Sequence, residues 1–303
     1  MSIFAVHVLS DVSIFAFPSK DVFWPYFAGA VILVVGLFAT RNEVAQARGM
    51  EKLLVLARVF FAVTMAEFGA QHFTQAQGVS TIVPAWIPAP LFWTYLVGVS
   101  LEAAALAIAA GKYARLAAAM LALMLFLFIV LMHIPNIIAE PAKVTRWATG
   151  FRDLFFCAGM LAFAGTYVER SREGRAAMAV TFARIFMAAS AIFFGIEHFR
   201  HRESLPGLDF DQMTPAWIPA HALWPYPAGI IFLGTGVSLL FNWKPRLAAR
   251  CLGFGALAML VCVFLPLVLS NWSDIDNGLN FFVSTLAFCG AAFLLANAEP
   301  QEI

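Results

Sequence analysis

Two histidines in matching surroundings are the first candidates for chemistry in this sequence. His72 and His198 each lie in a Gly-x-x-His-Phe motif, and these motifs begin at Gly69 and Gly195. An imidazole can exchange a proton near neutral pH, hydrogen-bond a ligand, or bind a metal or haem iron. Each histidine is therefore a candidate for these roles, with the plainer alternative that it only satisfies a neighbouring carbonyl or carboxylate.

Carboxylates accompany these histidines inside apolar segments. Glu67 lies five residues before His72, Glu197 is adjacent to His198, and Glu102 lies in the next apolar segment after His72. Ionisable groups are costly within a membrane and tend to mark functional sites. Glu67 and Glu102 have no basic neighbour in their own segments, so we expect them to bind a ligand together with His72. Glu197 with His198 would be the corresponding pair in the second half.

Metal binding is an alternative that the spacing supports weakly. The sequence has no His-Glu-x-x-His pair, and Glu197 and His198 diverge by about 100° on a helix. A site would need histidines to converge from separate segments. The candidates for such a site are His72, His198, His201 and His221.

Each histidine motif is followed by the hexapeptide Pro-Ala-Trp-Ile-Pro-Ala, at 84–89 and 215–220. Two prolines disfavour a helix and favour extended backbone. We expect a short interfacial or re-entrant hairpin that places Trp86 and Trp217 at headgroup depth. Either these tryptophans only anchor the chain at the membrane surface, or the hairpin covers a ligand pocket that contains the histidine.

These motifs belong to a longer repeated order, which indicates a duplication. An arginine precedes each histidine by fourteen positions, at Arg58 and Arg184, and a Trp-x-Tyr-x-x-Gly motif follows at 93–98 and 224–229. A third such motif at 24–29 opens the first apolar segment. The sequence thus predicts two similar units preceded by one extra helix.

Composition places these units in a membrane. The 303 residues are 62% hydrophobic and 12% charged, and the mean hydropathy is +0.82. A soluble core cannot bury so much apolar surface, so lipid must be the main solvent. The formal net charge of +1 gives no basic field, and we expect no nucleic-acid partner.

Apolar segments predict an all-α, polytopic transmembrane bundle of about nine spans, in two parallel four-helix repeats. The segments are 24–40, 53–73, 92–110, 115–134, 150–167, 180–199, 224–242, 246–270 and 279–297. Residues 1–52 are expected to hold an interfacial segment and the first helix. The repeats would occupy 53–168 and 180–303, with a cytoplasmic linker at 169–179.

Basic residues predict the orientation. Most of the 19 lysines and arginines lie in the connections 41–58, 112–115, 170–184 and 244–250. The positive-inside rule assigns these connections to the cytoplasm. We therefore expect a bacterial inner-membrane protein with its amino terminus outside and its carboxyl terminus in the cytoplasm. His72, His133 and His198 would then lie towards the outer face.

The two units are not equivalent. His133 precedes Pro135 by two residues, whereas the second unit repeats only the proline, at Pro266. Leu233 stands where Glu102 would recur. We therefore expect the first unit to carry more of the function, with His133 among its candidate ligand-binding residues.

The order of motifs resembles the DoxX/DoxD-like family of bacterial integral membrane proteins. The likeness rests on the arginine, Gly-x-x-His-Phe, Pro-x-Trp-x-Pro, the Gly98-x-x-x-Glu102 element and the basic turn, and it excludes only about the first fifty residues. It implies a four-helix unit in tandem duplication. It also implies a link to quinone-dependent sulfur oxidation or to oxidative-stress membrane complexes, but it supplies no catalytic residue.

Two functions follow from these observations. The first is a redox-linked membrane subunit that holds a quinone near the outer face and works with other membrane or periplasmic redox subunits. The second is a small-molecule transporter or a non-catalytic scaffold of a larger membrane complex. The sequence has no Walker A loop, dinucleotide fingerprint or nucleophile elbow, so any catalysis would need a bound cofactor or a partner. A quinone is the first cofactor to expect, before a metal or haem.

Overall fold

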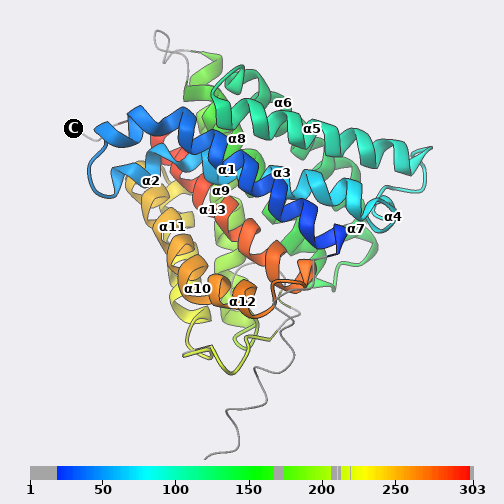
Figure 1. Ribbon diagram of the computed structural model, residues 1–303. Coiled ribbons are helices and arrows are strands. Elements are labelled where there is room, and N and C mark those ends of the chain that lie inside the picture. The colour runs from blue at the N-terminus through cyan, green and yellow to red at the C-terminus, as the bar shows by residue number, and fades with distance from the viewer. Residues whose placement is uncertain (1–18, 167–173, 206–209, 211–212, 219, 301–303) are drawn as a thin grey trace, which may run out of the picture.

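The computed structural model describes residues 19–166, 174–205, 210, 213–218 and 220–300 (Figure 1). Within these ranges the chain is helical and contains no strand. The protein is a helical membrane bundle, as predicted. Of the predicted interfacial segment, residues 1–18 lie outside this description, as do residues 169–173 of the predicted linker.

Each predicted apolar segment corresponds to a helix. The long helices are α1 (Lys20–Gln46), α3 (Ala57–Thr74), α5 (Pro90–Ala110), α6 (Ala114–Phe128), α8 (Val144–Thr166), α9 (Arg175–Arg200), α10 (Pro225–Leu240), α11 (Pro245–Met259) and α13 (Asn280–Ala298). The short elements are α2 (Glu51–Val55), α4 (Ala76–Ser80), α7 (Ile134–Ala139), α12 (Leu265–Ser270) and the π-helical turns η1 (Ile129–His133), η2 (Leu260–Phe264) and η3 (Ile275–Leu279).

Six helices in the described ranges are long and apolar enough to cross a membrane. They are Lys20–Gln46, Pro90–Ala110, Ala114–Ala139, Ala176–Arg200, Pro245–Ser270 and Ile275–Ala298. α3 and α8 are not among them, and α10 has only 16 residues. The chain is therefore a multi-pass membrane protein, and the number of nine spans stays a prediction.

α13 lies at the centre of the bundle. It packs against α3, α8 and α11, and most of its side chains are buried. Figure 1 shows it in red between the amino-terminal helices and α11. Phe288 on α13 contacts Phe155 and Phe156 of α8 and Phe194 of α9. This aromatic core joins the two halves of the chain.

A π-helical turn lies just before the proline in each of two long helices. η1 ends two residues before Pro135, and η2 ends two residues before Pro266. Proline inside a helix lacks an amide hydrogen and clashes with the carbonyl four residues earlier. A wider π turn accommodates both effects and lets the helix continue.

The two proline-rich hexapeptides begin with turns of the same kind. The amide of Ile87 donates to the carbonyl of Pro84 at 2.9 Å, and the amide of Ile218 donates to that of Pro215 at 3.0 Å. Each hexapeptide ends on an alanine with φ near 55°. The turns thus connect α4 to α5 and lead into α10 without a helix of their own.

Candidate functional site

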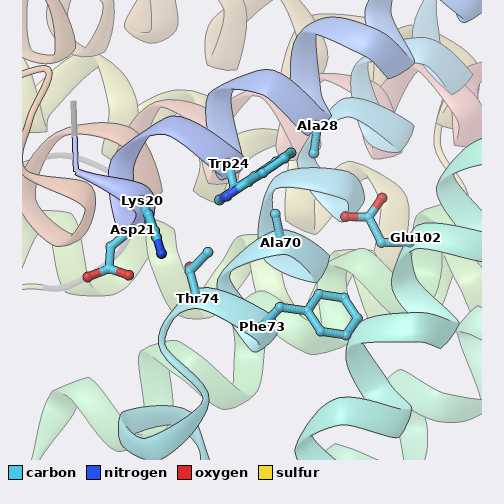
Figure 2. Close-up of a pocket in the computed structure, with 8 residues that line it drawn as sticks. All are labelled: Lys20, Asp21, Trp24, Ala28, Ala70, Phe73, Thr74 and Glu102. Carbon is cyan, nitrogen blue, oxygen red and sulfur yellow. The ribbon is translucent and has the colours of Figure 1, made fainter. Parts of the chain in front are cut away.

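An open cavity of about 500 Å³ lies between α1, α3 and α5. Figure 2 shows the side chains around it. The lining residues are Lys20, Asp21, Trp24, Ala28, Ala70, Phe73, Thr74 and Glu102. In this view Trp24 and Phe73 lie on two sides of the space, and Glu102 lies far from Lys20 and Asp21. The cavity therefore combines aromatic walls with polar groups at its two ends.

Glu102 is partly buried on α5 and packs against a glycine of α3. A Cβ added at Gly69 would lie 3.0 Å from Cγ and from Oε1 of Glu102. In the second half a Cβ added at Gly195 would lie 2.6 Å from the backbone nitrogen of Leu233. Glu102 and Leu233 thus occupy matching positions against matching glycines. The tandem duplication itself stays a prediction.

Glu67 lies beside the cavity, at the contact between α3 and α1. Its side chain is buried, and its Oε2 atom has no hydrogen-bond partner in the described part of the chain. A Cβ added at Gly29 would lie 2.2 Å from its Oε1 atom. Gly29 follows Ala28, and Glu67 lies one turn before Ala70, so this carboxyl group is next to the lining without being part of it.

Substituting Gly29 with alanine tests this contact. We expect the free energy of unfolding to fall by about 1–3 kcal/mol, because the new methyl group must displace the Glu67 carboxyl or separate the helices. The measurement is SDS unfolding of the purified protein in mixed micelles, followed by circular dichroism. Gly234→Ala on α10 is the matched control, since no atom lies within 4 Å of a Cβ added there. Equal losses in both variants would contradict the contact.

His72 is held by its own helix. Its Nδ1 atom lies 2.7 Å from the carbonyl oxygen of Phe68, and because a carbonyl can only accept, Nδ1 must donate. A Cβ added at Gly98 would lie 2.9 Å from Cβ of His72. His72 therefore packs between α3 and α5 but does not line the cavity. Its predicted role in ligand binding stays a prediction.

His198 has the same backbone partner but a different environment. Its Nδ1 atom donates to the carbonyl oxygen of Phe194 at 2.5 Å. The ring centroids of Phe210 and Phe232 lie 5.4 and 5.5 Å from the centroid of the imidazole. Its Nε2 atom is buried, with no partner in the described ranges. His198 is thus enclosed by aromatic rings, away from the cavity.

Glu197 takes part in local ion pairs. One oxygen lies 2.9 Å from Nη1 of Arg200, and the other lies 3.3 Å from Nε2 of His201. These partners are three and four residues further along the helix, a spacing that brings side chains together. The imidazole of His201 thus contacts the carboxyl group of Glu197, and His221 lies in an exposed turn. Among the residues that the structure describes, no three or more histidine, cysteine or acidic side chains gather as metal ligands.

His133 forms a buried pair that the sequence did not reveal. Its Nε2 atom lies 2.8 Å from Oδ2 of Asp153, and Nε of Arg152 donates to the other oxygen at 3.1 Å. Both His133 and Asp153 are buried. Asp153 thus has two partners, Arg152 beside it on α8 and His133 from η1. This cluster is separate from the cavity residues.

Trp86 and Trp217 do not contribute to the cavity. Their exposed fractions are 66% and 53%, and their anchoring role stays a prediction. Sequence reasoning missed the four cavity residues of α1. The Trp-x-Tyr-x-x-Gly motif at 24–29 related α1 to α5 and α10, but it carried no information on which helices α1 would contact.

Comparison with known proteins gives one match. Residues 53–134 match the DoxX family model. No curated protein and no solved structure matches the chain. The matched region extends through α3, α5 and α6 to η1, so it includes half of the cavity lining and excludes α1.

Proposed function

We propose that this membrane protein, whose residues 53–134 form a DoxX domain, binds the ring of a quinone in the cavity between α1, α3 and α5 as a subunit of a redox complex. The observation that carries the proposal is a half-open, aromatic cavity with one membrane-embedded carboxyl group at its side. Sites for small molecules are commonly concave, mainly apolar, and fitted with a few polar groups. A volume of about 500 Å³ lies within the range of such sites.

The aromatic walls suit a planar ring. Trp24 and Phe73 present aromatic surface to the cavity, and Ala28 and Ala70 leave space between the helices. Phe23 and Phe27 on α1 are exposed beside Trp24. An apolar tail of the ligand would lie along this surface in the lipid while the ring occupies the cavity.

The carboxyl group of Glu102 suits a ring oxygen. A protonated carboxyl group donates a hydrogen bond to a quinone carbonyl, and an ionised one accepts a hydrogen bond from a quinol hydroxyl. Thr74 also lines the cavity, and its hydroxyl oxygen is buried with no hydrogen-bond partner in the described part of the chain. The chain would thus bind and orient both redox forms of the ligand.

Partner subunits would supply or remove the electrons. Quinone reduction takes up two electrons and two protons, and in this proposal the electrons come from a membrane or periplasmic redox subunit. With the amino terminus outside, Lys20 and Thr74 at the ends of α1 and α3 would place the cavity near the outer face of a bacterial inner membrane. This location allows contact with a periplasmic partner.

Binding of decylbenzoquinone to the full chain in lipid nanodiscs tests the proposal. We expect saturable binding that Trp24→Ala weakens about three- to tenfold, because an aromatic contact contributes about 0.5–1.5 kcal/mol. Equilibrium titration with calorimetric detection gives the affinities. Trp243→Ala, an exposed tryptophan before α11, is the control and should bind as the natural sequence does.

Two results would contradict this proposal. Absence of saturable quinone binding would leave the DoxX domain without the proposed ligand and favour a scaffold or transporter. Equal affinity in the Trp24→Ala variant would place the ligand elsewhere.

A further inference from the structure

Helix α1 lies outside the DoxX domain, yet it supplies half of the cavity lining. Lys20, Asp21, Trp24 and Ala28 come from α1, and the other four lining residues come from α3 and α5. A domain made of residues 53–134 alone would therefore leave the cavity open on one side. The identity of the ligand must depend on α1 as well as on the domain.

We infer that α1 selects the ligand, with Lys20 binding a second oxygen on the ring across from the oxygen that Glu102 binds. This inference rests on the proposed quinone site and names the ligand class more closely. The class is a planar ring with oxygens at opposite positions. A ring with one oxygen would satisfy Glu102 and leave Lys20 without a ligand contact.

The charge pattern of the cavity supports this assignment. The ammonium group of Lys20 forms no ion pair with any of the described residues. Adjacent residues on a helix do not face each other, so Asp21 is poorly placed to neutralise it. Figure 2 shows Lys20 and Glu102 on different sides of Trp24 and Ala70. The cavity thus has a hydrogen-bond donor at one side and a carboxyl group at the other.

The reach of the two groups also fits their proposed roles. Lysine carries three donors on a flexible stem, so it can follow a ring oxygen near the membrane surface. Glu102 is held against Gly69 and has less freedom. Glu102 would therefore fix the position of the ring, and a hydrogen bond from Lys20 would favour ligands that carry the second oxygen.

The experiment compares ligands that differ by one hydroxyl group. Decylhydroquinone and the two decylphenols that each lack one of its hydroxyls are titrated into the full chain in nanodiscs. For the natural sequence we expect the phenols to bind about five- to tenfold more weakly than the hydroquinone. In Lys20→Met the difference should disappear for the phenol that lacks the hydroxyl facing Lys20, because the group that binds this second oxygen is absent. It should remain for the phenol that lacks the hydroxyl facing Glu102.

Lys52→Met is the matched control, since Lys52 is exposed on α2 and does not line the cavity. The Lys52→Met protein should bind the phenols more weakly than the hydroquinone, by the same factor as the natural sequence. Persistence of the full difference for both phenols in Lys20→Met would overturn the role of Lys20 while leaving the quinone site intact. Absence of hydroquinone binding in the natural sequence would instead overturn the proposed function itself.

Discussion

The Asp153→Ala protein will lose about 3 kcal/mol of its free energy of unfolding, because the substitution leaves His133 buried without its partner and Arg152 without its counter-ion. The His133 Nε2 atom lies 2.8 Å from Asp153, and both residues are buried. Arg152 is more accessible, with 26% of its side chain exposed. The lost ion pair of Arg152 should therefore account for the smaller share of the decrease in the free energy of unfolding. SDS unfolding in mixed micelles measures the difference.

Glu140→Ala is a suitable control for this prediction. Glu140 also pairs with two basic residues, Lys143 and Arg146, but it does so in the connection between α7 and α8. Hydrogen bonds from Lys143 and from Arg146 lower the pKa of Glu140. Exposed ion pairs contribute little to stability, so this variant should unfold nearly as the natural sequence does. Similar unfolding of the two variants would show that burial of the Asp153 cluster does not matter.

The positions of the helices could be predicted because the membrane leaves the backbone few alternatives. Each apolar segment must satisfy its own hydrogen bonds, so hydropathy alone located them. The ends were less certain: α1 begins at Lys20 and continues to Gln46, whereas the predicted segment covered 24–40. The helix continues through polar residues at both ends, and hydropathy identifies only its apolar part.

The neighbours of each helix could not be predicted in the same way. The contact of Glu67 with α1 depends on the absence of a side chain at Gly29. Many glycines in a membrane protein permit such an approach, and the sequence does not say which one is used. The four cavity residues of α1 were missed for this reason.

The pairing of His133 with Asp153 shows a second limit. The two residues are twenty positions apart and lie in different helices. A π-helical turn holds more residues than an α-helical one, so η1 changes the direction in which the following side chains point. Pro135 indicates an irregular turn in the helix, but the kind of turn depends on how the helix packs. By contrast, the ion pairs of Glu197 follow from helical spacing and could have been predicted.

The Glu102→Leu protein will bind decylbenzoquinone about two- to tenfold more weakly, because it loses the hydrogen bond that a protonated carboxyl group donates to a quinone carbonyl, about 0.5–1.5 kcal/mol. Leucine is the residue that the second half of this chain carries at the matching position, where Leu233 packs against Gly195. The substitution should therefore preserve the fold, and SDS unfolding should be nearly unchanged. Titration in nanodiscs measures the affinity, and Glu102→Gln, which keeps an amide donor, should recover part of the binding to the quinone.

If the Glu102→Leu protein folds poorly but keeps its affinity for the quinone, Glu102 has a structural role between α3 and α5. Unchanged binding in a folded Glu102→Leu protein would exclude this carboxyl group from the ligand site, because the ring would then bind without a hydrogen bond to Glu102.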